Sequence, residues 1–181
     1  MKPLLKILLG GFLVFMALAI AQEWSFFSQT WFGADEAAAE LTPEDREGSV
    51  QAVELTLDLM RHLYASGGDS RFADRLPTSA GVLEEMLADI DYLTRNQRRQ
   101  DPKLERLDVE AVELLETGSV EVRTRELWSI RFLWLDGAGE SDPHRVEVVR
   151  SRYLVTPGST GWIVEGWEAL ESTPASSETG T

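Results

Sequence analysis

The spacing of apolar residues changes about halfway along the chain, from a helical period to a strand period. Between residues 44 and 93, apolar side chains recur every three or four positions, which is typical of helices with one buried face. Thr42 is a suitable helix cap, and Pro43 suits the first helical turn because it needs no hydrogen-bond donor there. The pattern therefore predicts a first amphipathic helix over Glu44–Tyr64.

A second long helix is predicted to begin after Thr78 or Ser79, each of which is a good cap. Its apolar stripe ends at Leu93, and the helix is expected to run on through Arg95–Gln100. The pair Asp101-Pro102 should stop it, because a proline disfavours the helical conformation of the residue before it.

From Leu104 onward apolar and polar residues alternate, which is the period of a strand with one buried face. The alternation slips after Ala111, and this slip predicts a bulge. Three further strands are expected, separated by glycine-rich turns: Ser119–Leu135, Arg145–Thr156 and Trp162–Leu170. The predicted fold class is α+β, with helices first and then a meander of long antiparallel strands.

The first residues have the order of a secretory signal. Lys2 and Lys6 precede an uncharged apolar run, Ile7–Ala21, which ends in Ala-Ile-Ala. The run is shorter than the roughly 20 residues that span a bilayer, which favours cleavage after Ala21.

The aromatic residues that follow favour the opposite outcome, an uncleaved membrane anchor. Trp24, Phe27 and Trp31 lie on one face of a helix, and tryptophan is enriched at the boundary between membrane and water. We expect a hydrophobic N-terminal helix that keeps the N-terminus in the cytoplasm and attaches a periplasmic domain to the inner membrane. Cleavage would instead release the domain into the periplasm.

The chain is thus expected to contain four parts. They are a signal peptide or signal anchor at 1–21, an aromatic juxtamembrane segment and spacer at 22–41, an α+β domain at 42–171 and a disordered tail at 172–181.

The predicted domain resembles the NTF2-like superfamily, which includes SnoaL-like and Tim44-like domains. The resemblance covers about residues 42–170 and rests on four segments: Glu44–Tyr64, Leu127–Leu135, Arg145–Val155 and Gly161–Leu170. It implies a cone in which helices pack on a curved antiparallel sheet. Members of the superfamily include enzymes, small-ligand binders and protein–protein adaptors, so the resemblance leaves the function open.

Composition argues against several classes of chemistry. The net charge of −14 disfavours binding to nucleic acid, and there is no cysteine for a disulfide or a thiolate nucleophile. The two histidines, His62 and His144, lack the spacing of a metal site, and there is no phosphate-binding loop or nucleophile motif. We therefore expect no metal and no cofactor, and these absences favour a non-enzymatic function over an enzymatic one.

One acidic residue interrupts the apolar face of the long strand. Glu126 lies between Thr124 and Trp128, and it would point into the cone if that face lines it. Enzymes of the resembled superfamily place an acid or base in such a pocket, so Glu126 is the candidate catalytic residue. Two structural alternatives stay open: a bulge turns Glu126 outward, or Arg150 or Arg152 on the next strand pairs with it.

The aromatic residues of the strands offer a candidate ligand pocket. Its lining would consist of Trp128, Phe132, Trp134 and Tyr153, and it would suit a small apolar ligand.

A candidate partner surface comes from the last strand and from a basic cluster. Trp162 and Trp167 are five residues apart, so on a regular strand they face opposite sides and one of them faces outward. Arg95, Arg98 and Arg99 belong to the main basic cluster of an acidic chain and could bind an acidic partner.

Two functions fit these observations. The first is a non-enzymatic, membrane-anchored extracytoplasmic domain that binds protein partners or copies of itself, as an accessory or scaffolding subunit of a membrane complex. The second is a soluble periplasmic protein that binds or converts a small apolar ligand, with Glu126 as its polar group.

Overall fold

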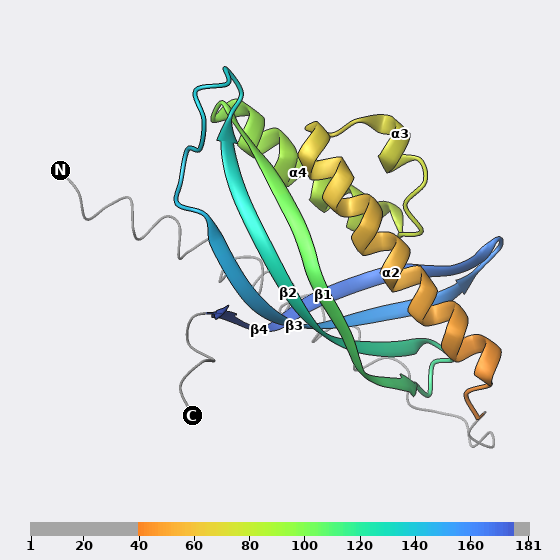
Figure 1. The fold of residues 1–181 in the computed structure, drawn as a ribbon. Helices are drawn as coiled ribbons and strands as arrows, with labels where there is room; N and C mark the ends of the chain where they lie inside the picture. The colour runs from red at the N-terminus through yellow and green to blue at the C-terminus, as the bar shows by residue number, and fades with distance from the viewer. Residues whose placement is uncertain (1–39, 176–181) are drawn as a thin grey trace, which may run out of the picture. The chain divides into compact units, whose positions relative to one another are not determined.

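The computed structural model describes residues 40–175, and these form one α+β unit (Figure 1). Its helices are α2 (Pro43–Ser66), α3 (Ser70–Ala73) and α4 (Ala80–Arg95). Its strands are β1 (Arg98–Leu114), β2 (Val120–Trp134), β3 (Arg145–Gly158) and β4 (Gly161–Pro174). The predicted order of helices followed by antiparallel strands is confirmed. The predicted N-terminal helix and its aromatic residues lie outside the described residues, and no helix within residues 40–175 has the length and apolarity to cross a membrane.

Helix α2 begins and ends where local chemistry favours it. The Thr42 hydroxyl accepts a hydrogen bond from the backbone N–H of Asp45 at 3.1 Å, and Pro43 occupies the first turn. The helix ends at Gly67, whose φ of 74° lies in the left-handed region that glycine adopts without strain. The predicted first helix is therefore confirmed, with two more residues at its end.

The second long helix ends earlier than predicted. Helix α4 stops at Arg95, and Gln97 has a positive φ of 59° that breaks the helical path. The expectation of a helix through Gln100 is wrong because Arg98–Gln100 pair with the end of β2 as the start of β1. Pro102 lies within β1, which is an edge strand where a missing N–H can face away from the sheet.

The four strands form one antiparallel sheet in the order β1-β2-β3-β4. A bulge is present in the first strand at Glu110, just before the slip predicted after Ala111, and a second register shift lies between Leu104 and Arg106. Strand β4 has two bulges of its own and continues to Pro174. Residues 172–174 thus pair with β3, and the expectation that they belong to a disordered tail is wrong.

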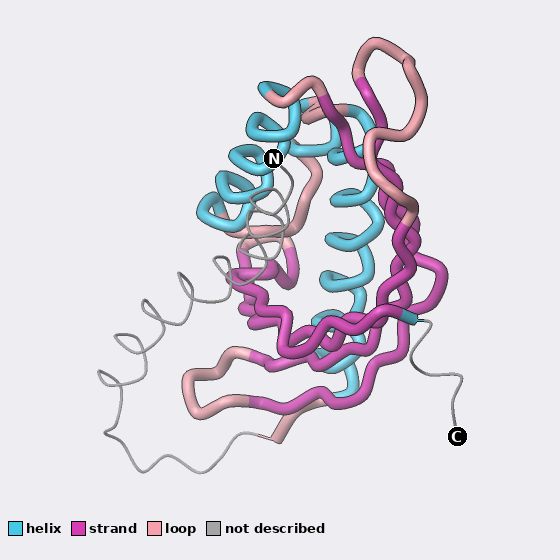
Figure 2. The backbone as a smooth tube through the Cα atoms, turned by 90° about the vertical axis from the view of Figure 1, so that its left-hand side faces the viewer, coloured by secondary structure: helices cyan, strands magenta, loops and turns pink. Residues whose placement is uncertain are grey.

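The helices lie on one side of the curved sheet, which we call the inner face (Figure 2). Even-numbered residues of β2 from Val120 to Trp128 point to this face and are buried against α2. Trp162 of β4 packs so closely on α2 that only a glycine fits opposite it, at Gly48. No helix among residues 40–175 covers the opposite face of the sheet, which we call the outer face.

Helices α2 and α4 are also joined by a partly buried polar contact. The Tyr64 hydroxyl donates a hydrogen bond to Asp89 Oδ2 at 3.2 Å. Burial raises the pKa of the Asp89 carboxyl above its ordinary value of 3.8, and the hydrogen bond from Tyr64 only partly offsets this. Burial and the nearby Asp89 carboxylate raise the pKa of Tyr64, so the tyrosine remains a neutral donor.

The contact between Gly48 and Trp162 predicts the effect of adding one methyl group. A Cβ at Gly48 would lie 2.6 Å from Trp162 Cδ1, whereas a Cβ at Gly81 of α4 would meet its nearest atom at 3.9 Å. We expect Gly48→Ala to destabilise the fold by about 1–2 kcal/mol, because overpacking outweighs the helix propensity of alanine. Gly81→Ala is the matched control and should not destabilise. Urea unfolding followed by tryptophan fluorescence checks both, and a stabilised Gly48→Ala variant would contradict the described packing.

The raised pKa of Asp89 predicts a pH-dependent effect. The folded chain holds this proton more tightly than the unfolded chain, so the stability contributed by Asp89 is lost as the pH rises from 3.8 through the raised value. As the pH rises through that window, the free energy of unfolding of Asp89→Asn should therefore increase relative to that of the parent chain. In more acidic solution, the difference in free energy of unfolding between the two chains should not change with pH. Urea unfolding at a series of pH values measures this. Asp91→Asn, an exposed position on the same helix, is the control, and an equal gain there would contradict the prediction.

Candidate functional site

Glu126 points to the inner face and is 2% exposed. It lies in the middle of β2, opposite Leu107 of β1 and Val149 of β3. The alternative that a bulge turns Glu126 outward is wrong, because the pairing of β2 with β3 is regular along its whole length. The alternative of a salt bridge is also wrong: Arg150 and Arg152 pair with other acids on the outer face.

Three side chains hold the Glu126 carboxylate. The Thr124 hydroxyl and the Tyr153 hydroxyl donate to Oε1 at 2.6 Å and 2.7 Å, and the Trp128 indole N–H donates to Oε2 at 2.7 Å. Thr124 and Trp128 lie two residues to either side on the same strand face, and Tyr153 comes from β3. Burial raises the pKa of Tyr153 well above 10.0, and the nearby Glu126 carboxylate is the second largest cause of this rise. The Tyr153 hydroxyl therefore stays protonated.

This geometry indicates a structural role for Glu126. All three donors are themselves buried, at 0% to 6% exposure, so a substrate has no path to the carboxylate in this arrangement. Charge-assisted hydrogen bonds between buried partners stabilise a carboxylate that would otherwise be costly in the core. A catalytic role for Glu126 stays a prediction that this geometry does not favour.

The four aromatic residues of the predicted ligand pocket do not gather in one place. Trp128 and Tyr153 are linked through Glu126 in the core. Trp134 lies at the far end of β2, with the Arg98 guanidinium 5.0 Å from its ring centre, and Phe132 has Arg145 at 5.7 Å. These cation–π contacts cover the two distal rings with charged side chains rather than with a shared apolar cavity.

The expectation that Trp162 and Trp167 face opposite sides is wrong. A bulge at Glu165 shifts the phase of β4, so Trp162 pairs opposite Pro157 and Trp167 opposite Tyr153 on the same inner face. Both rings are partly buried against the core. Neither tryptophan therefore faces outward, as the predicted partner surface required.

The predicted basic cluster is divided among separate contacts. Arg95 pairs with Asp91 on its own helix, and Arg98 pairs with Asp142 at 3.0 Å. Arg99 donates to the carbonyl oxygen of Ala65 at 2.9 Å and so connects β1 to the end of α2. Trp24, Phe27 and Trp31, the predicted membrane-interface residues, lie outside the described residues.

The outer face carries a different basic group, which we call the arginine quartet: Arg123, Arg125, Arg150 and Arg152. The register places Arg123 directly opposite Arg152 and Arg125 directly opposite Arg150. Sequence reasoning missed this juxtaposition, because it depends on the register between two strands. The available signal was a pair of arginines two residues apart in each of two strands that form a hairpin.

Acidic residues surround the arginine quartet. Arg152 is held by Glu168 of β4 at 2.5 Å, and Arg123 by Glu121 and Glu113 at 2.7 Å and 3.0 Å. The contacts of Arg150 are longer, at 3.2 Å to Glu110 and 4.0 Å to Glu171. Arg123 and Arg152 are thus held by acidic residues at shorter distances than Arg150 is.

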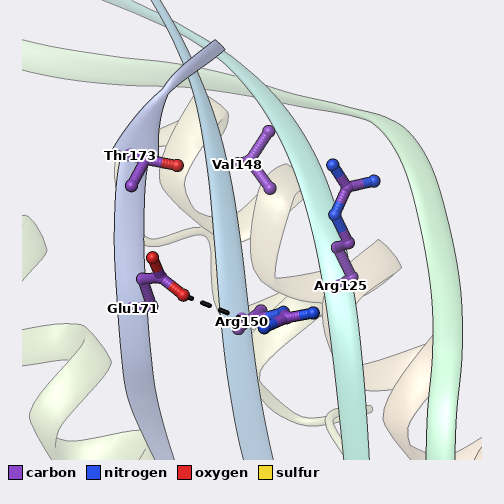
Figure 3. A pocket seen from close by; sticks show the side chains of 5 residues that line it. All are labelled: Arg125, Val148, Arg150, Glu171 and Thr173. Carbon is purple, nitrogen blue, oxygen red and sulfur yellow. Dashed lines mark ion pairs between the residues drawn. The ribbon is translucent and has the colours of Figure 1, made fainter. Parts of the chain in front are cut away.

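A half-open pocket of about 210 Å³ lies at Arg150 (Figure 3). Three adjacent strands line it, with Arg125 from β2, Val148 and Arg150 from β3, and Glu171 and Thr173 from β4. Figure 3 shows the two arginines on neighbouring strands, and Glu171 connected to Arg150 by their ion pair. Acidic residues outside this lining already contact both guanidinium groups: Asp108 lies 4.0 Å from Arg125, and Glu110 lies 3.2 Å from Arg150.

Among residues 40–175, no group of three or more histidine, cysteine, aspartate or glutamate side chains is arranged so that it could hold a metal ion.

Comparisons with known proteins show the fold alone. No protein-family model and no curated protein matches the chain. The intermembrane space region of the chloroplast protein ARC6 is 18% identical, with a TM-score of 0.58 over 70% of this chain and 96% of that one. A domain of unknown function with a cystatin-like fold from Nostoc punctiforme is 16% identical, with a TM-score of 0.40 over 72% of this chain and 81% of that one.

The soluble domain of TrwG, from the type IV secretion machinery of Bartonella grahamii, is 16% identical, with a TM-score of 0.34 over 76% of this chain and 96% of that one. The ARC6 region shares the α+β architecture with its antiparallel sheet, and the other two are too distant to add to this. None of these likenesses confirms the NTF2-like resemblance.

The hydrogen bonds to Glu126 predict a large effect of removing its charge. In Glu126→Gln an amide N–H₂ replaces one acceptor oxygen, so that it faces a buried donor. We expect a loss of about 1–3 kcal/mol in the free energy of unfolding. Glu165→Gln, at an exposed position of β4, is the matched control and should change stability by less than about 0.5 kcal/mol. Urea unfolding measures both, and equal stability of the two variants would contradict the structural role.

Proposed function

We propose that the chain is a non-enzymatic protein-interaction domain, an accessory or scaffolding subunit of a larger membrane assembly. The observation that carries the proposal is the contrast between the two faces of the sheet. The inner face is covered by helices and has its acidic residue buried and hydrogen-bonded. The outer face carries the arginine quartet, its surrounding acids and the pocket at Arg150.

The membrane location is part of the same proposal and rests on the sequence pattern of residues 1–33. Lys2, Lys6 and the apolar run that follows would hold the N-terminus in the cytoplasm and attach the domain to the periplasmic side of the inner membrane. Membership of the NTF2-like superfamily belongs to the proposal as well. Helix α2 packed within a curved antiparallel sheet is what that resemblance implies.

The ARC6 region is named for the intermembrane space, but its likeness to this chain shows the fold and not a function. The alternative of a periplasmic protein with a small apolar ligand depended on Glu126 as an accessible polar group. The burial of that group removes the feature that favoured this alternative.

A cross-linking experiment on the full chain in its native membranes tests the proposal. Val146 on the outer face and Leu87 on α4 are exposed to almost the same extent, 38% and 37%, and thus form a matched pair. A photo-activatable residue is placed at one position or the other, and the cross-linked products are separated by mass.

We expect one reproducible cross-linked protein from position 146 and none from position 87. Capture from position 87 alone would place the interface on the helices and contradict the proposed face. Capture from neither, with a native size equal to a single chain, would contradict the interaction function itself.

A further inference from the structure

Strand β4 forms one edge of the sheet, and only the first part of its free edge is paired. The backbone N–H of Val164 donates to the carbonyl oxygen of Pro77 at 2.7 Å, and its own carbonyl accepts from the N–H of Ser79 at 2.9 Å. The pairing segment runs parallel to β4 and ends at Ser79, which caps helix α4. Beyond Glu165, no backbone group among residues 40–175 bonds to this edge of β4.

The register identifies the residues of β4 that present backbone groups at this edge. Both backbone groups of Val164 point away from β3, and Val164 pairs opposite Val155. In an antiparallel ladder this orientation recurs at every second residue. Counted in steps of two along β3, which has no bulge in its pairing with β2, the next residues of β4 with this orientation are Trp167, Ala169 and Ser172. Their outward N–H and C=O groups are therefore available to an added strand.

The other edge of the sheet is protected against strand addition, and this part of β4 is not. Nine of the 17 residues of β1 are charged, and the strand includes Pro102 and Lys103. Proline and lysine on an edge strand disfavour pairing with another chain. Residues 166–173 contain neither, and Leu170 is 51% exposed there. Both strands have bulges, so bulges do not distinguish the two edges.

The charge of β4 indicates which kind of strand would bind. Its 14 residues include three glutamates and no basic residue. Glu165 is exposed and has no ion pair among residues 40–175, and Glu171 lies 4.0 Å from its partner Arg150. A second copy paired through β4 would bring two acidic strands together, in chains that each have a net charge of −14. Self-association through this edge is therefore disfavoured, whereas a basic strand is attracted.

We propose that the edge of β4 between residues 166 and 173 binds an extended, basic segment of a partner protein as a fifth strand of the sheet. Main-chain hydrogen bonds hold the segment, and its basic side chains lie near the glutamates. This inference rests on the proposed interaction function and names the binding mode and the chemistry of the partner. It also agrees with the cross-linking position chosen above, because β4 ends at Pro174 opposite Glu147, the neighbour of Val146.

The test uses an eight-residue extended peptide as the probe. The peptide acetyl-TVKVTVKV-amide is titrated into the isotope-labelled full chain in detergent micelles, and the backbone amide resonances are followed. We expect saturable shifts confined to residues 166–173, with slower hydrogen exchange at the amides of Trp167, Ala169 and Ser172. The matched peptide acetyl-TVEVTVEV-amide should bind about tenfold more weakly or worse, because its glutamates meet those of β4.

Two proline variants make the test specific to the backbone of β4. Ala169→Pro removes one outward N–H at an edge position where the ladder to β3 does not need it, and should weaken peptide binding about tenfold. Ala169→Ser keeps the N–H and is the matched control, with unchanged affinity. Ser172→Pro, at an exposed position, is compared in the same way with Ser172→Ala. Thermal unfolding identifies which variants keep the fold.

Four results would overturn the inference. They are equal shifts at β1, glutamate-peptide binding as tight as lysine-peptide binding, folded proline variants that bind as tightly as their controls, or no saturable shift from either peptide. Failure of the proposed function gives a different result. Cross-linking from position 146 that persists unchanged in Ala169→Pro and Ser172→Pro would keep the interaction function and remove only the strand addition.

Discussion

The register between β2 and β3 is the constraint on which the rest of the structure depends. Because side chains alternate between the two faces of a strand, this register puts Glu126 among its donors on the inner face and Arg125 opposite Arg150 on the outer face. A slip of one residue would expose the core valines and bury the arginines. The hydrogen bond from Tyr153 opposes such a slip, because it is the one of the three that joins β3 to Glu126 on β2. A buried acid thus serves to specify the fold, at a cost in desolvation that its donors offset.

The two faces of the sheet consequently have different tasks. The inner face holds the helices, with Trp162 packed against Gly48 and with Tyr64 and Asp89 joining α2 to α4. The outer face concentrates arginines on the central strands and acids around them. A charged surface of this kind contributes little to stability, since exposed ion pairs are weak, but it can select a partner by the placement of charge.

Much of the fold could be predicted from local signals. The cap at Thr42, the helical period of the first half and the alternation after Leu104 are properties of neighbouring residues, and they identified the helices and the strands. The end of α4 could not be predicted in this way. Residues 98–100 suit a helix end, yet they pair with β2. Pairing between strands therefore outweighs the local helical preference here.

The candidate site was harder to predict because it depends on pairing between strands. The bulge at Glu165 turns Trp167 to the same side as Trp162, and nothing in the spacing of the two tryptophans indicates it. The inward position of Glu126 was visible in the alternation of its own strand. Its donor Tyr153, and the meeting of Arg125 with Arg150, required knowledge of the register.

Reactivity of single cysteines along β2 is the measurement that tests the two-faced account most directly, because the chain contains no cysteine of its own. Cysteines placed one at a time at residues 124–129 would be labelled with a thiol reagent, first in the purified chain and then in its native membrane assembly. The account predicts that only positions 125, 127 and 129 react in the purified chain, and that the assembly protects these while a cysteine at position 87 of α4 remains reactive. Reactivity at 124, 126 and 128, or an assembly that leaves the outer positions as reactive as before, would contradict it.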